Sequence, residues 1–123
     1  MITNSLVHQI TLGRSGKNWG LSMGMPKLES IIDGVTKGTY TLLFSGTGSG
    51  KTSLALYSYI YRPLVEHLHD DNFKVTYYSL EMSSELLFAK LLCMHIFEEY
   101  GVELSTKELL SKREGIYIKR RAL

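Results

Sequence analysis

The chain has 123 residues, of which 44% are hydrophobic and 21% charged, and its formal net charge is +2 at pH 7. This length and composition are typical of one small soluble domain, and the charge is too small to argue for nucleic acid or a membrane surface as a partner. The single cysteine, Cys93, excludes an internal disulfide and favours a cytoplasmic location. No apolar stretch approaches the roughly 20 residues of a membrane helix, so we expect no membrane partner.

Residues 1–24 are predicted to form an N-terminal segment, either a linker or a short strand. SLVHQITL, residues 5–12, has the pattern of a short strand, and the glycine-rich run after it predicts a loop. That loop contains GRSGKN, residues 13–18, with a Gly-Lys pair but without the glycine spacing of a phosphate-binding loop. A plain loop is therefore favoured over a contact to nucleotide or nucleic acid. For Trp19, contact with a neighbour and contact with an adenine ring both stay open.

Residues 25–123 are predicted to form one partial domain. PKLESIIDG, residues 26–34, has the apolar spacing of a short helix that a glycine closes. GTYTLLFS, residues 38–45, predicts a buried strand between two glycine turns. KTSLALYSYIYRPLVEHL, residues 51–68, predicts a helix that Pro63 breaks or kinks.

The second half of the chain continues with a strand and two helices. FKVTYYSLE, residues 73–81, predicts a second strand that ends on an acid. Residues 83–101 predict a long helix that starts on a serine, stops on a glycine and is apolar enough to be buried or in an interface. STKE, residues 105–108, matches a capping box that opens a helix to about residue 114. The tail, residues 115–123, begins like a strand and ends in a basic cluster.

The loop between the first predicted strand and its helix has the composition of a phosphate cradle. Its three glycines let backbone N–H groups approach phosphate oxygens, Lys51 reaches the terminal phosphates, and the Thr52 hydroxyl coordinates Mg²⁺. The pattern GxxxxGK[ST] places its first glycine where this chain has Ser45, which is a mild departure. We therefore expect ATP and Mg²⁺ as ligands, bound by Ser45, Gly46, Thr47, Gly48, Ser49, Gly50, Lys51, Thr52 and Ser53.

Glu81 is the candidate for aligning the attacking water. In a parallel sheet the carboxyl ends of neighbouring strands share one crevice, which would bring Glu81 near the loop if the two predicted strands are neighbours. The alternative is that Glu81 merely precedes the next helix, where an acid is favourable. Spacing alone does not choose between these interpretations. The order strand, loop, helix, strand, helix predicts an α/β fold with a parallel sheet.

The run YYSLEMSSELLFAKLLC, residues 77–93, together with SGTGSGKT, residues 45–52, resembles the RecA-like ATPase core of DnaB-type replicative helicases, phage or bacterial. The likeness runs from about Gly20 to Cys93. It implies a three-layer RecA-like P-loop NTPase fold, of which the chain holds the first strands and helices. It also implies that Glu81 activates the water, that ATP lies at the interfaces of a homo-oligomeric ring, usually hexameric, and that single-stranded DNA occupies the channel.

A second acid after an apolar strand, which such a motor uses to hold the Mg²⁺-bound water, is not recognisable. The best candidate, LLCMHIFEE at residues 91–99, lies within a helical pattern and is a poor match. The chain is thus expected to hold only the first part of the core, and whether it hydrolyses ATP alone stays open. The alternatives are a KaiC-like or recombinase-type ATPase, a P-loop small-molecule kinase, and a non-catalytic nucleotide-binding module.

Overall fold

The computed structural model describes residues 1–17 and 19–110, in which helices form but no β-strand. The chain divides into two compact units, Met1–Asp70 and Asp71–Leu123. No described helix is long and apolar enough to cross a membrane. The tail expected to begin as a strand and end in a basic cluster lies outside the described residues, as does the expected helix end near residue 114.

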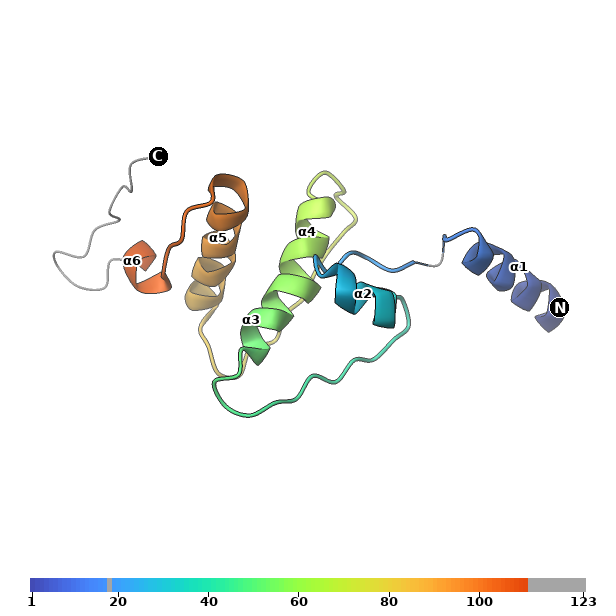
Figure 1. Ribbon diagram of the computed structural model, residues 1–123, viewed down its shortest axis with the longest axis horizontal. Helices are drawn as coiled ribbons and strands as arrows, with labels where there is room; N and C mark the ends of the chain where they lie inside the picture. Colours follow the sequence, from blue (N-terminus) through green and yellow to red (C-terminus); the bar gives the residue numbers. More distant parts are fainter. Residues whose placement is uncertain (18, 111–123) are drawn as a thin grey trace. The chain divides into compact units, whose positions relative to one another are not determined.

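The N-terminal segment is a helix, α1, which spans Ile2–Arg14 (Figure 1). The expected short strand at residues 5–12 is therefore wrong. No strand pairs with this segment in the described part of the chain, so its N–H and C=O groups are satisfied within a helix instead. The hydroxyl of Thr11 adds a 2.8 Å hydrogen bond to the carbonyl of Val7, and Gly16, at a φ of +73°, follows the helix end.

The expected helix at residues 26–34 is confirmed as α2, Pro26–Ile32. Pro26 occupies the first turn, where its missing N–H costs no helical hydrogen bond. The helix ends on Asp33, whose backbone is left-handed with a φ of 58° and whose N–H donates to the Glu29 carbonyl at 2.9 Å. A side chain other than glycine therefore closes this helix, and the predicted terminating glycine lies one residue further on.

An isolated antiparallel bridge joins Leu21 to Val35, on either side of α2. Each residue donates its N–H to the other's carbonyl at 2.9 Å. A Cβ on Gly34 would lie 2.5 Å from the Leu21 carbonyl oxygen, and one on Gly20 would lie 2.6 Å from the Val35 carbonyl carbon. Glycine is thus required on both sides for the two segments to approach so closely.

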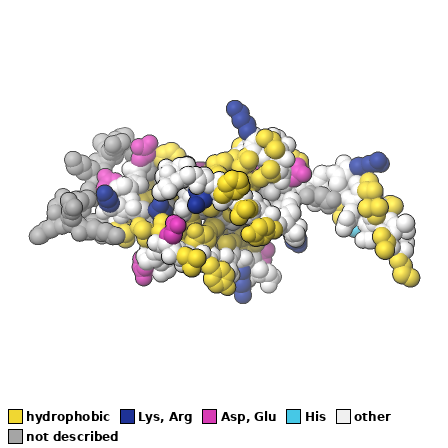
Figure 2. Space-filling model, turned by 90° about the horizontal axis from the view of Figure 1, so that it is seen from below, with side chains coloured by type: hydrophobic (Ala, Val, Ile, Leu, Met, Phe, Trp, Pro, Cys, Tyr) yellow, Lys and Arg dark blue, Asp and Glu magenta, His cyan; other side chains and the backbone are white. Residues whose placement is uncertain are grey.

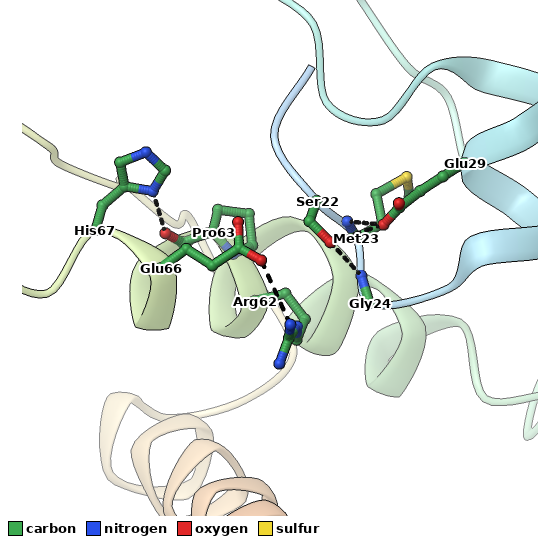
Figure 3. A network of polar contacts seen from close by, with 8 residues as sticks. All are labelled: Ser22, Met23, Gly24, Glu29, Arg62, Pro63, Glu66 and His67. Atoms are coloured by element: carbon green, nitrogen blue, oxygen red, sulfur yellow. Dashed lines mark hydrogen bonds and ion pairs between the residues drawn. The ribbon is translucent and has the colours of Figure 1, made fainter. Parts of the chain in front are cut away.

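A carboxylate ties the turn before α2 to that helix. Glu29 accepts hydrogen bonds from the Ser22 hydroxyl, at 2.9 Å, and from the backbone N–H of Met23, as Figure 3 shows. The Ser22 oxygen in turn accepts from the N–H of Gly24 at 3.2 Å. The Ser22 hydroxyl first, and then the Met23 N–H, lower the pKa of Glu29 below its ordinary value because both favour the ionised carboxylate.

The helix after the glycine loop is one continuous helical ribbon (Figure 1). Its three stretches are α3 (Lys51–Ala55), the π-helix η1 (Leu56–Tyr61) and α4 (Arg62–Glu66). Pro63 does not break the helix, because the chain widens its turn just before this residue. The alternative, that Pro63 kinks the helix, stays a prediction. The Arg62 N–H donates to the Tyr57 carbonyl, five residues earlier. In an α-helix the ring of Pro63 would clash with the Tyr59 carbonyl, and the wider turn relieves that contact.

The buried side chains of the first unit come mainly from this helix. Leu56 is 1% exposed and Tyr61 is 4% exposed, while Met23, from the turn before α2, is completely buried. The ring of Tyr61 also stacks on that of Tyr57, with centroids 5.9 Å apart. The core of the unit therefore joins the segment before the glycine loop to the helix after it.

In the second unit the long helix is confirmed as α5, Ser84–Tyr100. The hydroxyl of Ser83 caps its start by accepting from the Leu86 N–H at 3.3 Å, and Gly101 ends it with a φ of 65°. The expected burial is not found, since Ala89 is its one buried residue among those described, and Phe88 is 71% exposed. That the apolar face lies in an interface stays a prediction.

The capping box is also confirmed. Ser105 and Glu108 satisfy each other's backbone N–H groups at 2.9 and 3.2 Å, which opens α6, Thr106–Leu110. Helix α6 packs against α5, and an apolar groove between them is lined by Phe88, Leu92 and Leu109.

Neither segment expected as a core strand forms one in the described residues. Residues 38–45 and 73–81 have no ladder partner and are largely exposed, with Phe44 at 81% and Tyr78 at 89%. Hydrophobic side chains accordingly reach the surface in Figure 2. A strand needs a neighbour for its backbone groups, so the predicted α/β sheet is not confirmed by this structure.

We expect Glu29→Ala to lower the unfolding temperature of the first unit, because the Ser22 hydroxyl and the Met23 N–H lose their acceptor. A lowered native pKa means that this stabilisation is complete above the ordinary value of 4.5 and is lost as the pH falls through the lowered pKa. The variant should lack that acid-dependent loss. Thermal unfolding followed by Trp19 fluorescence from pH 7 to pH 3 measures it.

The control is Glu66→Ala, which removes only the exposed ion pair of Glu66 with Arg62, at 3.4 Å. Such pairs contribute little to stability, so the unfolding temperature of this variant should match that of the parent chain at every pH. Equal acid sensitivity in the parent and in Glu29→Ala would contradict the assignment.

Candidate functional site

The loop Ser45–Ser53 closes on itself through two serine hydroxyls. The Oγ atoms of Ser45 and Ser49 lie 2.5 Å apart, and Ser49 Oγ donates to the Gly46 carbonyl at 2.7 Å. The serine that stands in place of the motif's first glycine therefore takes part in holding the loop. The backbone of the loop is exposed to solvent throughout residues 45–51.

Two of the loop glycines have backbones that other residues rarely adopt. Gly48 has a φ of 77° and Gly50 a φ of 89°, whereas Gly46 is not in the left-handed region. A Cβ on any of the three would meet no atom within 4 Å. The requirement for glycine at positions 48 and 50 is thus conformational, and the space beside the loop is open to a ligand.

The loop leads directly into the positive end of a helix. Gly50 is the N-cap residue of α3, and its carbonyl accepts from the Leu54 N–H at 2.9 Å. No side chain caps this end and its first turn contains no acid, so the first N–H groups remain available to an anion. Lys51 is exposed and Thr52 half-buried in this first turn. This set of groups fits a phosphate chain with its Mg²⁺.

Glu81 lies at the tip of a turn that a serine closes. Ser79 Oγ donates to the Met82 carbonyl at 2.8 Å and accepts from the Met82 N–H at 3.1 Å. Leu80 and Glu81 are exposed between these two residues, and Ser83 then caps α5. The two serines of the Ser-Leu-Glu-Met-Ser run therefore fix the backbone on both sides of the acid.

The nine predicted residues form the glycine loop and the first turn of α3, and all lie in the first unit. Glu81 belongs to the second unit, Asp71–Leu123. The run at residues 91–99, in which a second acid was sought, lies inside α5 and forms no strand.

Two residues that shape these segments were missed from the sequence. Ser79 could have been found, because a serine after an extended run is a common turn residue. Glu29 left no such signal, since Ser22 lies seven positions away and outside any local capping pattern.

Comparison with known proteins gives one family match. The model of the DnaB-like helicase C-terminal domain matches residues 20–113, which is more than half of the chain and includes both the glycine loop and Glu81. Neither the curated proteins nor the solved structures gave a match.

The loop geometry predicts that Gly50→Ala weakens nucleotide binding more than Gly46→Ala does. Alanine in the left-handed region costs about 1–2 kcal/mol, which corresponds to an affinity loss of about fivefold to thirtyfold. Position 46 has no such backbone requirement. Titration of both variants with a fluorescent ATP analogue and Mg²⁺ compares them, and equal losses would count against the left-handed backbone at Gly50 as the cause.

Proposed function

Because the chain belongs to the family of DnaB-like helicase C-terminal domains, we propose that it is the ATP-binding part of a motor that couples ATP hydrolysis to the unwinding of duplex DNA. The family consists of helicase-type RecA-like P-loop ATPases, which bind ATP with Mg²⁺. The observation that carries the proposal is the loop Ser45–Ser53, which opens an uncapped helix with Lys51 and Thr52 in its first turn. Residues 25–123 would form part of the ATP-binding domain, with residues 1–24 as its N-terminal segment.

In this proposal the backbone N–H groups of the loop hold the phosphates of ATP. Lys51 neutralises charge on the transferred phosphoryl group, and the Thr52 hydroxyl is a ligand of Mg²⁺. When bound, Mg²⁺ would neutralise negative charge on the phosphates. Glu81 orients the attacking water and accepts its proton on a carboxylate oxygen. The exposed position of Glu81 on a serine-closed turn supports this role, because the carboxylate is free to face a ligand.

The proposed assembly is a homo-oligomeric ring, hexameric as in the family, with single-stranded DNA as its partner. Apolar surface on α5 supports further contacts. Phe88 and Phe97 are 71% and 51% exposed on this helix, and a partner surface would remove them from water. The segments 38–45 and 73–81 likewise form no strand in the described part of the chain, and additional strands of a RecA-like core would pair with them.

We expect MgATP to raise the unfolding temperature of the chain and Lys51→Ala to abolish the rise. A ligand at 100 times its dissociation constant adds about 2.7 kcal/mol if it binds only the folded state. Lys27→Ala removes an exposed lysine of α2 outside the loop and is the matched control. MgATP should raise its unfolding temperature as much as that of the parent chain. An equal shift in the parent and in Lys51→Ala would contradict the assignment of Lys51.

Glu81→Gln should keep MgATP binding in the assembled motor. Its rate of phosphate release should fall by about a hundredfold to ten-thousandfold, the usual contribution of a general base. Glu85→Gln, in the first turn of α5, is the control and should turn over ATP normally. Release of phosphate from ATP, with and without single-stranded DNA, measures both variants. Unchanged ATP turnover in Glu81→Gln would contradict the catalytic role of Glu81. If single-stranded DNA does not stimulate ATP turnover in the parent, a small-molecule kinase is favoured instead.

A further inference from the structure

The first unit contains a pocket that is separate from the glycine loop. Its volume is about 660 Å³, within the range of small-molecule sites, and none of Ser45–Ser53 lines it. The walls come from α1, from the segment around Trp19 and from residues 35–37. The pocket therefore includes part of the GRSGKN segment and Trp19, to which the proposed motor function gives no role.

The charge of the lining favours an anion. Lys17 and Lys37 both line the pocket and are exposed, and among the described residues no aspartate or glutamate lines it. The imidazole of His8, from α1, also lines the pocket. Two cations facing one cavity without a carboxylate create a positive field that a phosphate group would neutralise.

The pocket also presents an aromatic platform. The side chain of Trp19 is 56% exposed, although a residue of this size usually buries most of its surface. Apolar side chains of Leu12, Leu21 and Val35 line the pocket as well. An indole next to cations and apolar walls suits a ligand with a planar ring and a negative charge, which describes a nucleotide.

The backbone arranges the two key side chains in advance. Leu21 pairs with Val35 in the antiparallel bridge, with both hydrogen bonds at 2.9 Å. Trp19 lies two residues before the first of these and Lys37 two residues after the second. The bridge therefore holds the two segments that carry Trp19 and Lys37 next to each other, and both side chains line the pocket.

We propose that this pocket binds one nucleotide unit, with the base stacked on Trp19 and the phosphate between Lys17 and Lys37. The unit is either part of a single strand or a free nucleotide, because both carry the same base and phosphate. The site is distinct from the glycine loop and does not depend on the motor function.

Trp19 is the chain's single tryptophan, so its fluorescence reports on this pocket alone. The full chain is titrated without Mg²⁺ with a short oligothymidylate and, separately, with thymidine monophosphate. We expect saturable quenching by at least one of them. Quenching by the oligonucleotide alone identifies a strand as the ligand, and stronger quenching by the monophosphate identifies a free nucleotide.

Substitutions test the two lysines. The double variant Lys17→Ala/Lys37→Ala should weaken binding and, for a strand, reduce the slope of log affinity against log salt by about 0.7, the contribution of the one phosphate that the two lysines share. Lys27→Ala, an exposed lysine outside the pocket, is the control and should bind like the parent. Equal losses in the control and the double variant would overturn the site.

The stacking partner is tested by anisotropy of a labelled oligonucleotide or nucleotide, which does not need the indole as a probe. Trp19→Ala should lose about fivefold to 150-fold in affinity, whereas Trp19→Phe should retain most of it. Lys51→Ala should leave the quenching intact, because the glycine loop does not contribute. The proposal fails if neither ligand quenches Trp19, or if Lys51→Ala abolishes the signal. It also fails if Trp19→Ala, with an unchanged circular dichroism spectrum, binds as tightly as Trp19→Phe.

Discussion

The carboxylate of Glu29 holds the turn on which the packing of the first unit depends. By accepting from Ser22 and the Met23 N–H it holds a turn whose methionine is completely buried. Gly24 completes the turn, and a Cβ there would lie 2.8 Å from the Arg62 side chain, so the turn lies directly against the helix that follows the glycine loop. The loop is therefore anchored on its C-terminal side, where the helix that follows it packs against this turn.

Features that depend on neighbouring residues were predictable, and features that depend on distant partners were not. Ser83 and Gly101 cap α5 as expected, and Ser105 opens α6. An N-terminal cap needs only a side chain three positions from a backbone N–H, and a C-terminal cap needs only a residue with a left-handed backbone. Residues 38–45 and 73–81 have strand composition but no ladder partner in the described chain, so composition alone could not make them strands. Helix α1 was missed for the same reason, since an apolar octapeptide without a partner strand can satisfy its backbone as a helix.

The candidate site also combines features that the local sequence predicts with a contact that it does not predict. The identities of Lys51 and Thr52 and their place at the start of a helix followed from the motif, because its spacing is local. The contact between Ser45 and Ser49 did not, since the motif places a glycine at position 45 and so predicts no side chain there. The departure from the motif has a structural explanation, in that the added hydroxyl closes the loop that the missing glycine would have left free.

The widened turn of η1 shows how one helix meets two separate demands. Its start is determined by the glycine loop, which places Lys51 in the first turn, and its later part by the burial of Tyr61 and Pro63. A strictly regular helix advances about 100° per residue and would link these two positions rigidly. The extra residue in the π turn changes the angular phase between them. The end at the glycine loop and the packed end can therefore each take their own orientation without a break in the helix.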